Sequence, residues 1–255
     1  MRYTRSISAL ALSAALCAFI ASVPVRAQES GGNNLRAIPF AFVGTADECG
    51  GPAGSRIVTA AWLVGMGLPD NGGQNTTALD VATNPNRNDP HRGLLLSKNG
   101  ATADCSSAGV TISGTGRNFT LTELGFDYRN GTHCGAGAPR FNITSSLGFT
   151  YFAGCAAGTP TPAPQDTLEW TRVRFTLDAQ VFPASPSAPA FTFGPGGTQV
   201  RSLAIVYDEG TDTPSLEDPR GVGLSVLDNI DVNGRLIGRG SGIADGSDDR
   251  DDDGK

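Results

Sequence analysis

The sequence predicts an all-β protein, folded as a single jelly-roll-like antiparallel β-sandwich. Glycine and proline are abundant, with 34 and 16 residues. No segment keeps the apolar spacing of three and four residues that an amphipathic helix requires. Short runs of β-branched and aromatic residues alternate instead with clusters of Gly, Asn, Asp and Pro, as in strands joined by turns. The roughly 200 residues from Ile38 to Gly238 are enough for one large sandwich.

The two ends of the chain are predicted to lie outside this body. Arg2 and Arg5 precede an uncharged stretch from Ile7 to Val23. Pro24 and the pattern Val25-Arg26-Ala27 follow, as in a secretory signal peptide cleaved after Ala27. We expect a signal peptide at 1–27, an N-terminal linker at 28–37, the β-sandwich domain at 38–238 and a disordered acidic tail rich in Gly and Asp at 239–255. The protein is therefore expected to be secreted or periplasmic, with no membrane attachment after cleavage.

The strands are predicted from β-rich runs bounded by turn residues. They are Ile38–Val43, Arg56–Val64, Gly93–Ser97, Gly109–Ser113, Phe119–Arg129, Phe141–Thr144, Phe149–Ala153, Leu168–Leu177, Phe191–Phe193, Val200–Asp208 and Val222–Val232. The proline-rich stretches Thr159–Pro164 and Pro183–Pro189 are predicted as surface loops that cannot join a sheet interior.

Alternation along the strands predicts which side chains are buried. A β-bulge near Glu123 restores the pleat of the Phe119–Arg129 strand, whose apolar residues change parity there. In the strand Leu168–Leu177, the core set is Val173, Phe175 and Leu177, and the opposite face is Trp170, Arg172 and Arg174. In the last strand one parity holds Val222, Leu224, Val226, Ile230 and Val232 together with Asp228.

Cysteine usage indicates an oxidising compartment. Removal of Cys17 with the signal peptide leaves an even set of Cys49, Cys105, Cys134 and Cys155. The hairpin Phe141–Phe152 brings its flanking cysteines together, which favours a Cys134–Cys155 bond and leaves Cys49–Cys105. Metal binding by these cysteines is the alternative, but no CxxC pair occurs.

Net charge excludes some partners. The chain carries −6, and because the signal peptide holds three arginines and no acid, the mature chain carries −9. An acidic body does not bind nucleic acid, whose affinity depends on Lys and Arg, nor an anionic membrane surface. An extracellular polysaccharide or glycan is the expected partner.

The predicted ligand site is the outward sheet face with Trp170, Arg172 and Arg174, joined by Asp127 and Arg129 from a neighbouring strand. An aromatic ring stacks on the apolar face of a sugar, and charged side chains bind its hydroxyl or uronate groups. The alternative is an ordinary solvated face, on which arginine stems cover the ring.

Three late segments carry a family resemblance: Trp170–Phe175, Ile205–Gly210 and Val226–Val232. They resemble the last strands of the galactose-binding-like jelly rolls found in many carbohydrate-binding modules. The middle of the chain, Leu124–Gly154, resembles secreted bacterial proteins.

The resemblance implies a structural calcium ion (Ca²⁺) at Asp228, with Asp47 or Glu48 as a further acid. A carboxylate on an apolar strand face must find a cation or backbone N–H groups, so amide bonding is the alternative. In the tail, Asp249, Asp251 and Asp253 fit the opening of a calcium loop, or else form a solubilising tail.

A carbohydrate-binding module is therefore the predicted function, with two alternatives. One is a cell-surface or matrix structural domain without a small ligand, and the other is an exported carbohydrate-active enzyme. Catalysis has little support, because Cys134 beside His133 is expected in a disulfide and the spacing of Asp208 and Glu209 does not give their separation in space. No catalytic residue is predicted.

Overall fold

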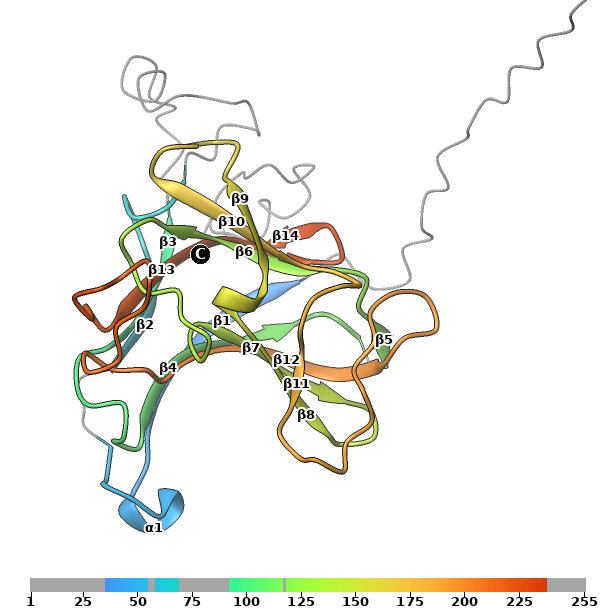
Figure 1. Cartoon of the computed structure of the whole chain (residues 1–255), viewed down its shortest axis with the longest axis horizontal. Helices are drawn as coiled ribbons and strands as arrows, with labels where there is room; N and C mark the ends of the chain where they lie inside the picture. Colours follow the sequence, from blue (N-terminus) through green and yellow to red (C-terminus); the bar gives the residue numbers. More distant parts are fainter. Residues whose placement is uncertain (1–34, 55–57, 69–91, 117, 238–255) are drawn as a thin grey trace, which may run out of the picture. The chain divides into compact units, whose positions relative to one another are not determined.

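The structure is a computed structural model, which describes residues 35–54, 58–68, 92–116 and 118–237 (Figure 1). Its elements are β1 (Arg36–Val43), α1 (Ala46–Cys49), β2 (Val58–Leu63), β3 (Gly93–Lys98), β4 (Ser106–Ser113), β5 (Phe119–Thr120), β6 (Leu124–Arg129), β7 (Arg140–Ser145), β8 (Thr150–Gly154), the 3₁₀ turn η1 (Cys155–Ala157), β9 (Thr159–Pro162), β10 (Trp170–Phe175), β11 (Phe182–Pro183), β12 (Gln199–Tyr207), β13 (Leu224–Val232) and β14 (Arg235–Ile237). Within these ranges, no helix is long and apolar enough to cross a membrane.

The strands form two antiparallel sheets, as predicted for a β-sandwich. The first sheet has the order β1-β4-β12-β7-β8-β11, with β5 paired to β12. The second has the order β2-β3-β13-β6-β10-β9, with β14 paired to β13. The chain crosses repeatedly between the sheets, so that β4 lies beside β12 and β3 beside β13. The all-β, jelly-roll-like fold class is confirmed.

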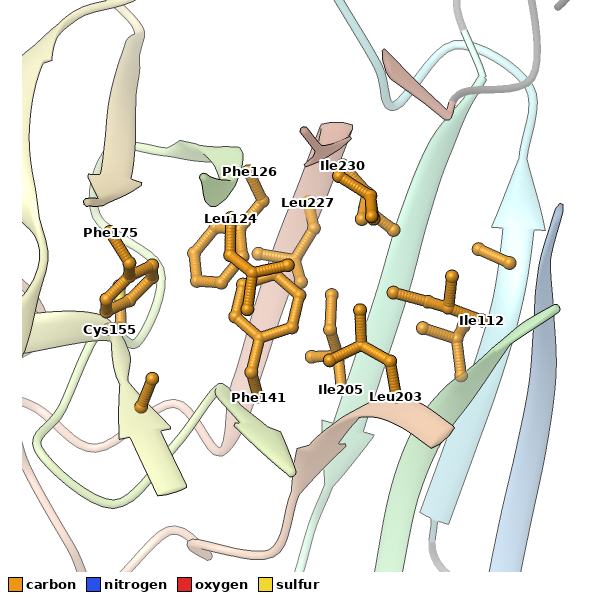
Figure 2. Close-up of a cluster of buried hydrophobic side chains, with 14 of the residues drawn as sticks. Ile112, Leu124, Phe126, Phe141, Cys155, Phe175, Leu203, Ile205, Leu227 and Ile230 are labelled. Atoms are coloured by element: carbon orange, nitrogen blue, oxygen red, sulfur yellow. The ribbon is translucent and has the colours of Figure 1, made fainter. Parts of the chain in front are cut away.

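Apolar side chains from the inner faces of both sheets fill the core (Figure 2). Phe126 and Phe175 of the second sheet meet Phe141 of the first, with ring centroids 5.6 and 5.8 Å from that of Phe141. Val173 and Phe175 are buried in this core, as the alternation in β10 predicts. Leu177 is not: β10 ends at Phe175, and Leu177 is 73% exposed, which corrects its predicted core position.

The segment Phe119–Arg129 is not one bulged strand. Phe119–Thr120 pairs with β12 in the first sheet, whereas Leu124–Arg129 pairs with β10 and β13 in the second. The change of parity near Glu123 therefore marks the crossing of the chain from one sheet to the other. A crossing between sheets and a β-bulge both shift the parity of the apolar positions, so the sequence alone does not distinguish them.

The bulge lies instead in β13. Its register against β6 shifts between Asp228 and Asp231, and Asn229 has a φ of 44°. The extra residue reverses the parity of the strand, so Val226 faces away from the main core while Ile230 and Val232 face into it. The prediction that these three share one face is wrong.

Both proline-rich stretches touch a sheet edge and neither enters a sheet interior, although each contributes residues to a short edge strand. Thr159–Pro162 forms β9 at one end of the second sheet, and Phe182–Pro183 forms β11 at one end of the first. Proline is tolerated there because an edge strand need not donate every backbone N–H group. The predicted strand Phe191–Phe193 is extended chain without sheet pairing.

The two disulfides have the predicted connectivity. Cys134 and Cys155 join the loop before β7 to the end of β8, with Cα atoms 5.2 Å apart. Cys49 and Cys105 join α1 to the start of β4, with Cα atoms 5.9 Å apart. Paired cysteines fit an oxidising, extracellular environment.

Candidate functional site

Trp170 is buried, which contradicts its predicted place in solvent. It does lie on the β10 face opposite Val173, but only 3% of its surface is exposed. A second apolar cluster covers the ring, formed with Leu68, Ala163 and Val226. Leu68 comes from the segment after β2, Ala163 follows β9, and Val226 belongs to β13, the strand with the bulge. No flat exposed ring is left at Trp170 for a sugar to stack on.

The charged residues predicted beside Trp170 do meet, but they bind one another. Asp127 is fully buried and accepts hydrogen bonds from Arg172 Nε at 2.9 Å, Arg172 Nη2 at 3.0 Å and Asn229 Nδ2 at 2.9 Å. Arg174 Nη1 lies 3.5 Å from the same carboxylate. Arg129 is exposed and pairs in register with Trp170. Since the protein's own carboxylates neutralise Arg172 and Arg174, these arginines are poorly placed to bind a uronate. Ligand binding by this face stays a prediction.

Asp231 belongs to the same network and has a strongly shifted pKa. Burial raises the pKa of the Asp231 carboxyl to about 7, the neighbouring Glu123 adds to the rise, and Arg174 opposes it. Arg174 Nε lies 3.1 Å from Asp231 Oδ2, and the other oxygen accepts the N–H of Gly234 at 2.8 Å. The folded state therefore binds a proton more tightly at this carboxyl than the unfolded chain does.

This shift predicts a pH dependence of stability. An aspartate with a raised folded pKa makes the free energy of unfolding fall as pH rises from about 4 to about 7, because the folded state must lose a proton it prefers to keep. We expect Asp231→Asn, which keeps an acceptor for Gly234, to flatten this fall. Urea unfolding across that range measures the effect. Asp178→Asn, at an exposed site, is the control and should follow the parent; identical slopes for all three proteins would contradict the shift.

The buried Asp228 carboxylate is bound by backbone N–H groups. Oδ2 accepts the N–H of Leu68 at 2.7 Å, and Oδ1 accepts that of Asn229 at 2.8 Å. These amides satisfy the carboxylate as the alternative to calcium requires. Among the described residues, no three His, Cys, Asp or Glu side chains gather to hold a metal. Calcium binding at Asp228 stays a prediction.

The other predicted calcium residues lie elsewhere. Glu48 caps α1, where its carboxylate accepts the backbone N–H of Thr45 at 2.7 Å and the helix keeps Asp47 in its exposed first turn. Asp249, Asp251 and Asp253 lie outside the described residues. Calcium binding by the tail stays a prediction.

A cavity of 430 Å³ lies beside the Cys134–Cys155 disulfide. Its walls come from the end of β6, the loop before β7, the turn η1 with β9, and the loop that follows β12. The lining residues are Tyr128, Cys134, Gly135, Ala136, Cys155, Ala156, Gly158, Pro160, Val173, Glu209, Thr213, Pro214, Ser215, Leu216 and Glu217. Ligand pockets have volumes of roughly 300–1,000 Å³ and apolar walls with a few polar groups, and this cavity has both properties.

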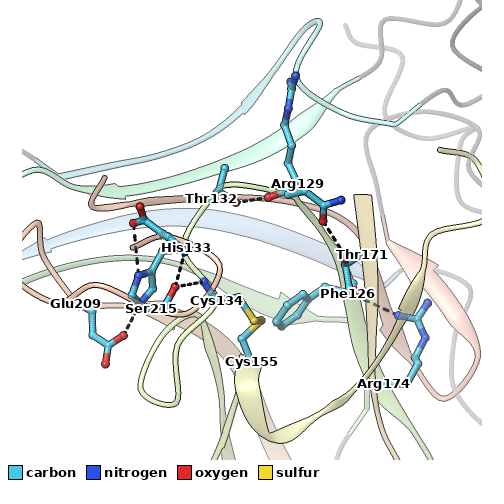
Figure 3. The surroundings of a disulfide bond; sticks show 12 residues. Phe126, Arg129, Thr132, His133, Cys134, Cys155, Thr171, Arg174, Glu209 and Ser215 are labelled. Atoms are coloured by element: carbon cyan, nitrogen blue, oxygen red, sulfur yellow. Dashed lines mark hydrogen bonds and ion pairs between the residues drawn. A yellow bond between two sulfur atoms is a disulfide. The ribbon is translucent and has the colours of Figure 1, made fainter. Parts of the chain in front are cut away.

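Hydrogen bonds join the two loops that form the cavity wall (Figure 3). The N–H of Cys134 donates to Ser215 Oγ at 3.4 Å, and the N–H of Asp218 donates to the same oxygen at 3.0 Å. The N–H of His133 donates to the carbonyl oxygen of Leu224 at 2.9 Å. The hydrogen bond from Cys134 to Ser215 thus holds the loop before β7 against the loop after β12.

Glu209 is held in the wall of the cavity by His133. The buried ring of His133 donates from Nε2 to Glu209 Oε2 at 2.6 Å, and Nδ1 lies 3.8 Å from Asp218. Gly135 and Gly137 leave room for the carboxylate, because a Cβ at Gly137 would lie 2.2 Å from Glu209 Oε1. The position of Glu209 therefore depends on the missing side chains at Gly135 and Gly137 as well as on the hydrogen bond from His133.

The residue pairs considered for catalysis, Cys134 with His133 and Asp208 with Glu209, have other partners in the structure. Cys134 is bonded to Cys155 and offers no thiolate beside His133. Asp208 and Glu209 follow one another in the chain but have different partners: Asp208 binds Arg140, with Nη2 2.7 Å from Oδ2, and Glu209 binds His133. Neither pair forms the nucleophile or the carboxylate couple weighed from the sequence.

Most residues of the cavity carry no signal in the sequence. In the sequence, Tyr128 is only one apolar position in an alternating strand. Thr213, Ser215 and Glu217 lie in a turn-rich loop with no recognisable motif. The even cysteine set was the useful clue, since Cys134–Cys155 forms one wall.

Comparisons with known proteins give little guidance. No family model matches the chain, and no curated protein matches it. Among solved structures, the chain is similar to the family 11 carbohydrate-binding module of the cellulosomal cellulase Lic26A-Cel5E of Clostridium thermocellum, with 14% identity and a TM-score of 0.38. The match covers 79% of this chain and 88% of that module. A similarity this low carries no argument about function.

Proposed function

We propose that this protein is an exported carbohydrate-binding module whose site is the cavity beside the Cys134–Cys155 disulfide. The observation that carries the proposal is the composition of the wall, which combines an apolar floor with convergent oxygen groups. Export rests on the signal-like segment 1–27, which lies outside the described residues, and on the paired cysteines.

The floor of the cavity suits the apolar face of a sugar ring. Tyr128 and Val173 project into the space between the sheets, and the disulfide and Pro160 continue the apolar surface. Aromatic and aliphatic groups contact the C–H groups of a sugar and exclude water. Only 5% of Tyr128 is exposed, so the ring offers an edge of the cavity wall rather than an open stacking face.

The rim supplies acceptors for sugar hydroxyl groups. Glu209 and Glu217 carry carboxylates, and Thr213 and Ser215 carry hydroxyl groups, all on the loop after β12. A hydroxyl that donates to a carboxylate forms a charge-assisted hydrogen bond, which is stronger than a neutral one. Four oxygen-bearing side chains over an apolar floor give a sugar both of the contact types it needs.

The test is glycan binding by parent and variant proteins. A glycan array identifies a ligand, and isothermal titration then compares the parent with Glu217→Gln. Loss of one charge-assisted hydrogen bond should weaken binding about tenfold. Glu169→Gln, which makes the same charge change at an exposed position outside the cavity, should bind like the parent. Failure of the parent to bind any glycan, or equal losses in both variants, would contradict the proposal.

A structural role at a surface is the second candidate. Strand β1 lies at one edge of the first sheet and exposes apolar side chains, with Ile38 at 52%, Phe42 at 45% and Val43 at 42%. An apolar edge of this kind favours contact with another macromolecule. Self-association lost on Phe42→Ser, in a protein that binds no glycan, would favour this role.

A further inference from the structure

From the charges around the cavity we infer that its ligand is an amino sugar, bound through a protonated amine at Glu217 and Glu209. The inference rests on the proposed function, because it names the class of sugar that the same cavity accepts. It differs from the expectation of a uronate, which needed free arginines.

Among the described residues, no Lys, Arg or His lines the cavity, and His133 contacts Glu209 from behind the wall. Among the described residues that form its wall, the charged ones are Glu209 and Glu217. Asp218 lies directly behind, 3.8 Å from the ring of His133. A sugar acid entering this space would meet carboxylates of its own sign, whereas a protonated amine would meet opposite charges.

Arg140 and Lys98, two cations bound near Asp208, have other partners. Arg140 donates to both oxygens of Asp208, at 2.5 and 2.7 Å, and to the carbonyl oxygen of Gly137 at 2.8 Å. Lys98 donates to three backbone carbonyl oxygens, including that of Asp208 at 2.9 Å. Neither cation is among the described residues that line the cavity.

Two tyrosines lie close to these carboxylates. Burial raises the pKa of Tyr207, and the charges of Asp218, Glu209 and Asp208 add to the rise. Burial also raises the pKa of Tyr128, a residue of the cavity wall, and Glu217 adds to the rise.

Glu217 is the better anchor for an amine. The Glu209 carboxylate already accepts from His133 at 2.6 Å. Glu217 is exposed at the rim, and within the described residues its carboxylate has neither a hydrogen-bond nor an ion-pair partner. An amine at the rim therefore gains an ion pair without breaking one.

The experiment compares three probes of equal length: a glucosamine oligosaccharide, its N-acetylated form and an oligogalacturonate. Titrations at low and moderate salt use the parent, Glu217→Gln and Glu169→Gln. We expect the amine form to bind the parent about tenfold more tightly than the N-acetylated form, and the uronate not to bind. Glu217→Gln should remove most of this preference, and Glu169→Gln should keep it.

The outcomes separate this inference from the proposed function. Equal binding of the amine and N-acetylated forms, or tighter binding of the uronate, overturns the amino-sugar inference while a carbohydrate site remains. Equal loss of amine binding in Glu217→Gln and Glu169→Gln means attraction to the net negative charge of the chain, and also overturns it. If no carbohydrate binds the parent at all, the proposed function fails as well.

Discussion

Removing each disulfide in turn should affect the free energy of unfolding and the ligand affinity differently. In the chain-entropy description, a disulfide stabilises in proportion to the logarithm of the loop it closes. Cys49 and Cys105 are 56 residues apart and Cys134 and Cys155 are 21 apart. Replacing each pair by serine should lower the free energy of unfolding by about 4 and about 3 kcal/mol, respectively.

The effects on binding should run in the opposite order. Cys134–Cys155 forms part of the cavity wall and anchors the loop that carries the His133 contact to Glu209. The variant without it should lose glycan affinity by more than tenfold at a temperature where it is still folded, since the wall is no longer held. The variant without Cys49–Cys105 serves as the control and should bind as the parent does. Circular dichroism confirms folding before each titration, and unchanged affinity without Cys134–Cys155 would refute the placement of the site.

Lys98→Met should lower the free energy of unfolding by about 3 kcal/mol. Lys98 is fully buried, and its ammonium group donates to the carbonyl oxygens of Thr102, Asp104 and Asp208 at 2.9, 2.8 and 2.9 Å. Methionine fills similar volume but leaves three partly buried carbonyl oxygens without this donor, and each unsatisfied group costs about 1 kcal/mol. Relief of the buried charge offsets part of this cost.

A matched change at the surface isolates the effect. Arg201 lies exposed on β12, and Arg201→Met should change stability by less than about 0.5 kcal/mol. Urea unfolding of both variants gives the comparison. Equal stabilities would mean that Lys98 does not hold the loop after β3 against the end of β12, and the role assigned to its three hydrogen bonds would be wrong.

Local pattern predicted the fold well because strand alternation records burial directly. Val173 and Phe175 face the core as predicted, and the hairpin argument gave the correct cysteine pairs. The errors arose where a crossing between sheets and a β-bulge produce the same alternation pattern in the sequence. A crossing between sheets at Glu123 had the pattern of a bulge, and the real bulge at Asn229 left the alternation of apolar residues in the last strand unbroken.

The site was harder to predict because its residues meet through contacts between segments that are far apart in the sequence. Trp170 lies on the predicted face, yet Leu68, from a segment over 100 residues earlier, helps to cover it. Glu217 approaches the disulfide only because the loop after β12 folds back on the loop before β7. No spacing in the sequence encodes that approach. Lys98 was overlooked for the same reason, since its acceptors belong to two separate loops.

The most direct test of the account is to locate a bound sugar by amide chemical-shift mapping. Titration of a glucosamine oligosaccharide into the labelled protein should shift the amides of Gly135, Ser215 and Glu217 most strongly, because these line the cavity. Shifts confined to Arg129 and the strand Trp170–Phe175 would place the ligand on the outer sheet face and contradict the cavity as the site.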